Sequence, residues 1–319
     1  MPRAATSAAN RLTLPLRAMS SALAAVLILA CAATTAAAAD RGRVKVQDGT
    51  VLSDRNTILR GARLPLIKGA VPPESYWHYL NATLGLNAIR YGVKTGHVGR
   101  TIEQQLPSLD LAVQRAANNN LYLMINNAVS PGTYNLEELK EFWSAVASRY
   151  KDRTHVFYEM TNEPVKGSPH WGHPVQFTDK VLADLQEIYL IMRNAAPNTH
   201  IVMFTTANLW PDCASWAALI QKMDKVDWSN ASVGFHHYNA THKFGETGLQ
   251  CLRQLYPLLM TETNYWVKPV RAPLRDALST YEKLGISWFS LDGTGGAFHL
   301  ENEIIPALNS GGYSWLPEN

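Results

Sequence analysis

Short apolar runs alternate with longer amphipathic stretches from residue 58 onward, and this regular alternation limits the fold more than any other feature of the chain. Short apolar runs are typical of buried strands, and apolar residues at helical spacing are typical of helices that pack on a sheet. The pattern predicts strands over 58–65, 87–93, 121–128, 156–161, 200–206, 232–238, 258–263 and 286–291. It predicts helices over 74–84, 102–119, 136–151, 177–195, 215–223, 249–255, 274–284 and 304–308.

Eight strand–helix pairs in about 250 residues are the number and size of a closed (β/α)8 barrel. The sequence therefore predicts an α/β fold, a (β/α)8 TIM barrel, in a single domain over 40–319. A doubly wound open sheet is the alternative, but no Gly-x-Gly-x-x-Gly turn follows the first predicted strand, and Gly61 and Gly69 have the wrong spacing. After residue 40 we find no linker, low-complexity tract or internal repeat.

The first 39 residues have the pattern of a secretory signal peptide. Three arginines precede an apolar run over 22–30, and small residues follow up to Ala39. The run is shorter than the roughly 20 apolar residues that a membrane-spanning helix needs. We expect cleavage after Ala39 and a secreted or periplasmic domain. The alternative is a lipoprotein, because 28–31 is similar to a lipoprotein cleavage box with Cys31 as the acylated residue.

Charge and cysteine content narrow the range of partners. Three of the 29 Lys and Arg residues lie in the leader, so the remaining 26 balance the 26 Asp and Glu residues. This balance predicts no nucleic acid partner, and no membrane partner for the mature domain unless Cys31 is lipidated. Cys213 and Cys251 are then either a disulfide or two buried thiols. Neither has a metal-type spacing, and we expect no metal or cofactor.

Polar side chains gather where the predicted strands end. The carboxyl ends of the strands meet at one rim of such a barrel, and that rim holds the catalytic groups. The residues at these ends are Arg90 in the second strand, Asn162 and Glu163 after the fourth, His236 and Tyr238 in the sixth, Glu262 in the seventh, and Trp288 in the eighth.

Glu163 and Glu262 follow strands that face each other across the ring. Two carboxylates in different environments are what glycoside hydrolysis requires, one protonated to assist the leaving oxygen and one ionised to attack or to activate water. Retention of configuration needs the carboxyl groups about 5 to 5.5 Å apart, and inversion leaves about 6.5 to 9.5 Å. The sequence does not give this distance.

The motifs around these residues resemble glycoside hydrolase family 5, the cellulase family of retaining barrel glycosidases. The similar segments are Gly85-Leu86-Asn87-Ala88-Ile89-Arg90, Tyr158-Glu159-Met160-Thr161-Asn162-Glu163-Pro164, His236-His237-Tyr238 and Met260-Thr261-Glu262. The resemblance covers nearly all of the chain from residue 58. It implies a catalytic pair, with Glu163 as acid/base and Glu262 as nucleophile. It also implies that Asn162 binds the sugar 2-hydroxyl, that Arg90 supports the nucleophile, and that His236 and Tyr238 line the cleft.

The chain departs from the family pattern in three places. The third strand ends in Asn126 and Asn127 where a histidine is common, so an amide is expected to take its place. Thr263-Asn264 replaces the usual aromatic and glycine after the nucleophile. In the eighth strand either Trp288 or Phe289 aligns with the family's stacking aromatic, and we expect Trp288. These departures bear on the substrate more than on the reaction type.

Several of these residues also have ordinary structural interpretations. Glu159 points the same way as Glu163 but about 13 Å further down the strand, which predicts a buried, hydrogen-bonded residue. Arg90 could neutralise such buried carboxylates, a role that would also keep the nucleophile ionised. His236 and His237 suggest a metal site. Consecutive strand residues point to opposite faces, however, so both imidazoles cannot easily enter one site. Trp171 lies in a loop directly after the acid/base and is a candidate cleft wall.

These observations predict a secreted, cofactor-free, retaining β-glycosidase that acts on a β-linked polysaccharide or oligosaccharide. An endo-acting β-1,4-glucanase is the first choice, and a β-mannanase or another β-glucanase of the same family is the alternative. Two further hypotheses are a carbohydrate-binding barrel that has lost catalysis and a metal-dependent hydrolase that uses His236. The sequence leaves the glycan, endo or exo action and the oligomeric state open.

Overall fold

The computed structural model describes residues 41–64, 70–94, 100–165, 177–206, 213–237, 245–263, 271–291 and residue 305. All of them belong to one compact unit, Ala39–Asn319. The expected signal peptide, its cleavage site and Cys31 lie outside the described residues. The expected last helix over 304–308 is described only at Ile305.

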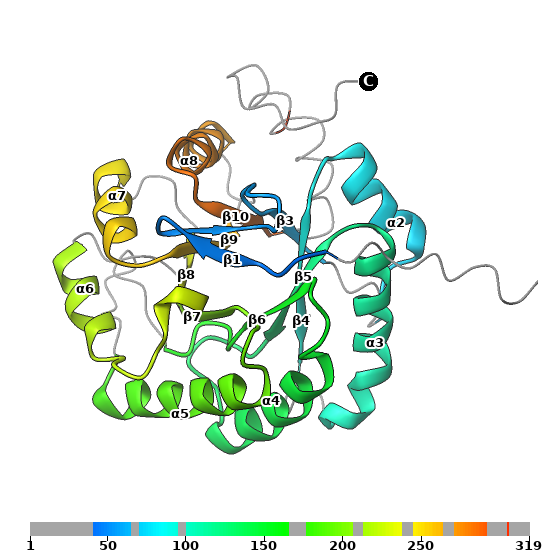
Figure 1. Cartoon of the computed structure of the whole chain (residues 1–319), viewed down its shortest axis with the longest axis horizontal. Helices are drawn as coiled ribbons and strands as arrows, with labels where there is room; N and C mark the ends of the chain where they lie inside the picture. The colour runs from blue at the N-terminus through cyan, green and yellow to red at the C-terminus, as the bar shows by residue number, and fades with distance from the viewer. Residues whose placement is uncertain are drawn as a thin grey trace, which may run out of the picture. The chain divides into compact units, whose positions relative to one another are not determined.

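Eight parallel strands close into a barrel, which confirms the predicted (β/α)8 fold (Figure 1). Each strand pairs with the next one in sequence, and the last pairs with the first through Trp288↔Arg60 and its neighbours. The strands are β3 (Arg60–Arg63), β4 (Ala88–Val93), β5 (Tyr122–Asn127), β6 (Val156–Glu159), β7 (Ile201–Thr206), β8 (Ala231–His237), β9 (Leu258–Thr263) and β10 (Ser287–Ser290).

Helices surround this barrel, and their bounds agree with the sequence pattern to within a few residues (Figure 1). They are α2 (Glu74–His78), which continues as the π-helix η1 (Tyr79–Thr83), α3 (Ile102–Asn118), α4 (Leu136–Tyr150), α5 (Asp179–Ala195), α6 (Cys213–Gln221), α7 (Gly245–Leu255) and α8 (Arg271–Leu284). Side chains cap several of their amino ends: Thr101 and Gln104 form a capping box on α3, and Asn135 accepts from Glu137 and Glu138 on α4.

The barrel interior is filled by a cluster of apolar side chains from alternate strand positions. It includes Tyr122, Met124, Phe157 and Phe289, and all four are fully buried. Gly61 leaves the space for Phe289, because a Cβ at that glycine would lie 2.3 Å from the ring. A second and larger apolar cluster fills the layer between the barrel and the helices. The core therefore has two layers, one inside the ring and one outside it.

A short hairpin covers the amino end of the barrel, and the sequence analysis did not predict it. It consists of β1 (Lys45–Gln47) and the antiparallel β2 (Thr50–Leu52). Asp48 and Gly49 both have positive φ, 51° and 70°, which matches the twist of a two-residue hairpin turn. β2 pairs with the start of β9, and the carbonyl of Val51 accepts a hydrogen bond from Ser287 Oγ at 2.6 Å. The hairpin thus closes this end of the apolar interior.

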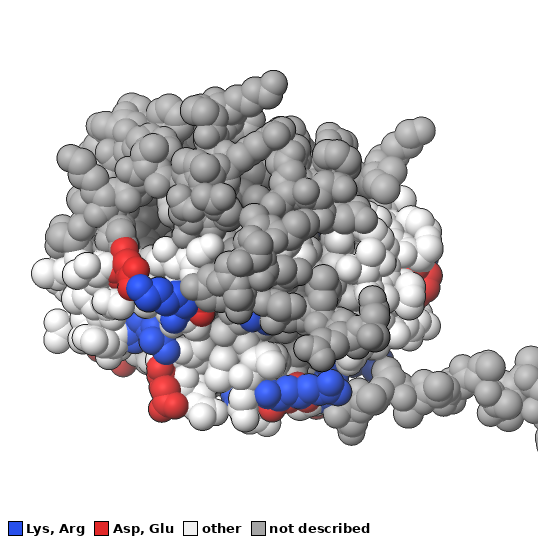
Figure 2. Space-filling view, turned by 90° about the horizontal axis from the view of Figure 1, so that it is seen from above, with Lys and Arg blue, Asp and Glu red and all other residues white. Residues whose placement is uncertain are grey.

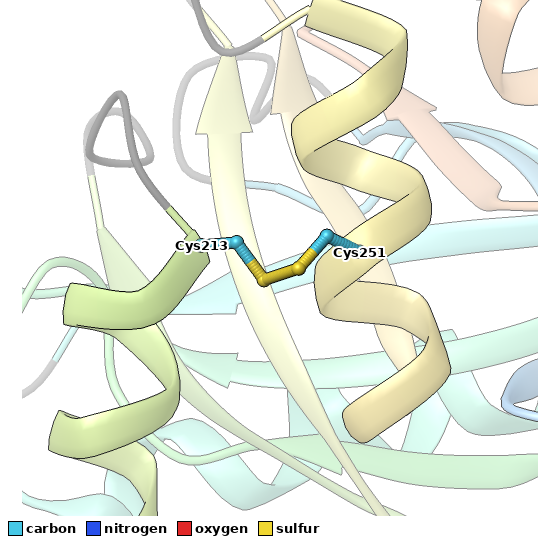
Figure 3. The surroundings of a disulfide bond; sticks show 2 residues. All are labelled: Cys213 and Cys251. Atoms are coloured by element: carbon cyan, nitrogen blue, oxygen red, sulfur yellow. A yellow bond between two sulfur atoms is a disulfide. The ribbon is translucent and has the colours of Figure 1, made fainter.

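Cys213 and Cys251 form a disulfide, so the open choice between a bond and two thiols is settled in favour of the bond (Figure 3). Their Cα atoms lie 6.2 Å apart, and the bond ties the first residue of α6 to the middle of α7. Within the described ranges, no helix is long and apolar enough to cross a membrane.

Charged side chains on the outer surface form pairs of opposite sign. Arg149 contacts Asp110 at 2.6 Å, and Lys222 contacts Asp179 at 3.0 Å. On the face drawn in Figure 2, blue and red side chains of the described residues lie next to one another, without a broad area of either sign. Exposed pairs of this kind contribute little to stability.

Candidate active site

Arg90 is the centre of a buried charge network at the carboxyl end of the barrel. Its Nε donates to Glu159 Oε2 at 2.5 Å, and its Nη2 donates to Glu159 Oε1 and to Asn162 Oδ1, both at 3.0 Å. Its Nη1 donates to Glu262 Oε2. The side chains of Arg90, Glu159 and Glu262 are 3%, 0% and 8% exposed. One guanidinium therefore holds two carboxylates and an amide in fixed positions, out of water.

Strand periodicity explains why these groups meet. Arg90 and Met124 are register partners on β4 and β5, and Asn126 on β5 is the partner of Glu159 on β6. Register partners point to the same face of a sheet, and so do residues two positions apart on one strand. The charged residues that come two positions after the apolar interior residues therefore also face the inside of the barrel, in a layer closer to its carboxyl end. Burial of this layer is compatible with charge because the guanidinium fork makes two parallel hydrogen bonds to Glu159.

Glu163 has an unusual backbone conformation. Its φ is 37°, in the left-handed region, which costs a residue with a side chain of order 1–3 kcal/mol. Two features fix the conformation: Pro164 follows, and the Glu163 carbonyl accepts a hydrogen bond from Gly132 N at 2.8 Å. The side chain is almost fully buried, and Glu163 Oε1 lies 2.7 Å from His236 Nδ1. The sharp turn after β6 thus aims this carboxyl group into the barrel mouth.

The structure brings Glu163 and Glu262 into one cluster. Glu163 contacts His236, and His236 is the register partner of Glu262 on the adjacent strand β9. Cα atoms of neighbouring strands lie about 4.8 Å apart. A register shift between Phe235 and His236 turns Glu262 to the same side as His236. On the other flank, Asn162, the residue before Glu163, shares Arg90 with Glu262.

A pocket of about 140 Å³ opens beside Glu262. Its lining consists of Arg63, Arg90, Lys94, Asn126, Ala128, Val129, Ser130, Asn162 and Glu262. Asn162 is held from two sides, since its Nδ2 donates to Val129 O at 3.1 Å. Asn126 is 1% exposed, and its Nδ2 has no hydrogen-bond partner among the described residues. The amide expected in place of a histidine therefore stands in the pocket wall.

Trp288 does not line this site, and its expected stacking role must be corrected. The indole is fully buried in the layer between barrel and helices, and Nε1 donates to Glu282 Oε1 on α8 at 2.8 Å. Phe289, the alternative, points into the barrel interior against Phe157. Both faces of a parallel barrel strand are apolar, so the sequence could not tell which aromatic faces which side.

Other expected site residues fall outside the cluster or outside the described ranges. His237 contacts Tyr281 on α8, on the opposite face of β8 from His236. Tyr238, Trp171 and Asn264 lie outside the described residues. Where the structure describes the chain, no group of three or more His, Cys, Asp or Glu side chains could hold a metal ion.

Sequence reasoning missed Arg63 and Lys94, which the structure places in the pocket wall. The available signal was their position, since Arg63 ends β3 and Lys94 directly follows β4. Charged residues at strand ends were counted only where they matched a motif, and these two matched none.

Comparison with known proteins identifies the family. The model of the family described as cellulase (glycosyl hydrolase family 5) matches residues 54–288, which include Arg90, Glu163, His236 and Glu262. The chain belongs to glycosyl hydrolase family 5. The sequence resemblance is thereby confirmed.

Two curated relatives show how distant the relation is. Endoglucanase A of Butyrivibrio fibrisolvens is 26% identical over 180 residues, 52% of this chain and 38% of that protein. Endoglucanase E-5 of Thermobifida fusca is 28% identical over 158 residues, 47% of this chain and 31% of that protein. The chain therefore spans only about a third of the length of these two relatives.

Solved structures of family 5 proteins share the fold. The catalytic domain of Thermobifida fusca endoglucanase Cel5A has a TM-score of 0.65 and 20% identity, with 79% of this chain and 85% of that chain covered. A variant of the same domain, solved in complex with cellotetraose, has the same TM-score and identity, with 80% and 86% covered.

Proposed function

We propose that this protein is a retaining β-glycosidase, and specifically an endo-acting β-1,4-glucanase that cleaves a β-linked polysaccharide. The observation that carries the proposal is one cluster with two carboxyl groups. In it, Arg90 donates a hydrogen bond to Glu262, and Glu163 contacts His236. Membership of family 5 and relatives named endoglucanases support the same reaction class. Cellotetraose bound to a protein of the same fold supports a β-1,4-linked glucan as substrate.

Glu262 is the nucleophile in this proposal. The Arg90 guanidinium favours its ionised form and leaves it one fixed orientation. In the first step a Glu262 oxygen bonds to the anomeric carbon while the glycosidic C–O bond breaks. Arg90 also binds Glu159. Its single positive charge is therefore shared between two carboxylates and compensates the charge of Glu262 only in part.

Glu163 is the acid/base. In the first step its proton passes to the departing glycosidic oxygen, and in the second step the resulting carboxylate takes a proton from water. The water oxygen bonds to the anomeric carbon, and Glu262 leaves as a carboxylate. His236 holds the Glu163 carboxyl group at Nδ1, which fixes its direction through both steps.

The leader predicts where this reaction takes place. An arginine-bearing segment, an apolar run and a stretch of alanines up to Ala39 support export and removal of 1–39. We therefore propose a secreted or periplasmic enzyme that acts on an extracellular polysaccharide. A disulfide between Cys213 and Cys251 fits an oxidising compartment.

The test compares Glu262→Ala, Glu163→Gln and the control Glu137→Gln, whose side chain on α4 is 79% exposed. We expect loss of reducing-sugar release from β-1,4-glucan by roughly 10⁴-fold or more for Glu262→Ala, with the protein still folded at the assay temperature. Glu163→Gln should retain a burst of dinitrophenol from a dinitrophenyl β-cellobioside, because that leaving group needs no proton. The control should behave as wild type. Proton NMR of the first product should show the β-anomer.

Near-normal turnover by Glu262→Ala would disprove the assignment. Tight binding of glucan without release of sugar, unchanged by either substitution, would instead favour a binding barrel without catalysis. Release from mannan but not from glucan would keep the mechanism and change the substrate to that of a β-mannanase.

A further inference from the structure

Two cations that face the pocket beside Glu262 have no acidic partner among the residues that the structure describes. Arg63 ends β3, and Lys94 directly follows β4. In the part of the chain that the structure describes, neither side chain forms an ion pair or a hydrogen bond. On the outer surface, by contrast, Arg149 and Lys222 contact carboxylates.

The position of Arg63 makes this feature costly. Arg63 and Arg90 are register partners on adjacent strands, so their side chains leave the sheet on the same face. Like charges directly opposite each other destabilise a pair of strands. Glu159 and Glu262 compensate the charge of Arg90, whereas no described carboxylate pairs with the half-buried Arg63. An uncompensated repulsion between two cations is expected where a ligand supplies the negative charge.

A third hydrogen-bond donor lines the same pocket. The buried Asn126 Nδ2 has no acceptor among the described residues and lines the same pocket. The one carboxylate in the lining, Glu262, already accepts from Arg90. Arg63, Lys94 and Asn126 are thus donors that face a common space, and we call them the cationic subsite.

We propose that the cationic subsite binds the carboxylate of an acidic sugar unit, so that the preferred substrate is a β-linked glycan that carries uronic acid residues. This inference rests on the proposed function and specifies its substrate. A uronic acid has a carboxylate where glucose has its hydroxymethyl group, and the ring keeps its size. A cleft that accepts a β-glucan therefore accepts the acidic unit without a wider cavity, and the guanidinium of Arg63 provides a matching fork for its two oxygens.

The test uses two matched ligands: neutral cello-oligosaccharides, and the same oligosaccharides oxidised at C6 to glucuronic acid units. The measured quantity is the ratio of kcat/KM for the oxidised to the neutral substrate. The variants are Arg63→Gln, Lys94→Gln and the double substitution, with Lys151→Gln as the control, because Lys151 is exposed between α4 and β6 at the opposite end of the barrel. Melting temperatures confirm that each variant is folded.

We expect wild type to favour the oxidised substrate by about tenfold, the size of one charge-assisted hydrogen bond. The double variant should bring the ratio close to one, each single variant should lie between, and Lys151→Gln should keep the wild-type ratio. About 0.5 M NaCl should reduce the wild-type preference, because salt screens the interaction. A wild-type ratio of one or below, or a preference that survives the double substitution, would overturn the inference.

Titration calorimetry separates this inference from the proposed function. If the protein hydrolyses neither ligand, the proposed function fails, while binding still decides the inference. Tighter binding of the oxidised oligosaccharide that is lost in the double variant supports the cationic subsite, and equal binding of both ligands refutes it.

Discussion

The two ends of the barrel handle buried charge in opposite ways. At the amino end, Arg60 and Glu282 form an ion pair through two hydrogen bonds of 2.8 Å, and the hairpin closes an apolar interior. At the carboxyl end, Arg90 is shared by two carboxylates, and Arg63 has no acidic partner where the structure describes the chain. The first end pairs its buried charges within the protein, and we propose that the other keeps charges for a substrate.

The disulfide is a stabilising feature near the carboxyl end of the barrel. It ties the start of α6, which follows the carboxyl end of β7, to α7. A separation of 38 residues corresponds to a loss of about 4 kcal/mol in unfolding free energy when Cys213→Ser and Cys251→Ser are combined. Urea unfolding with and without reductant measures it. Wild type in reductant should match the double variant, and equal stability of all samples would contradict a structural role for the bond.

Glu282→Gln tests the amino end. The substitution removes the ion pair between Arg60 and Glu282, so we expect a loss of about 3 kcal/mol in unfolding free energy and an unchanged kcat for the folded protein. Chemical denaturation and initial rates on the same samples measure both quantities. A fall in kcat with unchanged stability would contradict the proposed division between the two ends.

Glu159→Gln is the matched substitution near the carboxyl end, since Glu159 is also a buried glutamate with two hydrogen bonds from one arginine. Arg90 keeps Glu262 as counter-ion, so the loss of stability should be smaller than for Glu282→Gln. Arg90 would then hold Glu262 more strongly. We expect kcat, measured as initial rates on the folded variant, to fall by about 10- to 100-fold.

A purely structural role for Glu159 would lower stability and leave kcat of the folded variant unchanged. Glu159→Asp is the conservative control, because it keeps the charge and should restore part of kcat.

His200 gives the smallest effect and tests whether a buried group outside the site titrates with folding. Burial lowers its pKa from 6.5 to about 3, and Nε2 lies 2.9 Å from Ser232 Oγ. The unfolded chain then binds a proton below pH 6.5 that the folded chain refuses. Stability from this residue is complete above pH 6.5 and decreases toward pH 3, by up to about 1.4 kcal/mol per pH unit.

Unfolding midpoints of wild type and His200→Gln at several pH values between 7 and about 3.5 measure this slope. The variant should lose less stability per pH unit than wild type. Parallel curves would contradict the depressed pKa of His200, because His155 contributes equally to both proteins.

Sequence periodicity predicted most of the barrel because each strand and helix buries one regular face. The bounds of β4, β5 and α4 differ from the pattern by one or two residues. The hairpin was missed because its strands are three residues long, although Asp48-Gly49 is a typical two-residue turn signal.

The candidate site was predictable in its residue types and not in its geometry. The motifs identified Arg90, Glu163 and Glu262, and the spacing of Glu159 indicated a buried hydrogen-bonded side chain, as found. The positive φ of Glu163 and the register shift before His236 depend on tertiary contacts. The sequence predicted the wrong face for Trp288. In Ser287-Trp288-Phe289-Ser290, each face of the strand receives one serine and one aromatic residue, so the pattern does not distinguish the two faces.

The hairpin links the beginning of the domain to its end in the order of synthesis. Val51 accepts from Ser287, 236 positions later, and Thr50 accepts from Arg253, 203 positions later. A chain that emerges amino end first has no β9 or β10 on which β2 could settle. Contacts so distant in sequence form slowly. We therefore expect closure of the barrel to be the last step of folding. Until β9 and β10 are synthesised, β2 has no barrel strand to pair with.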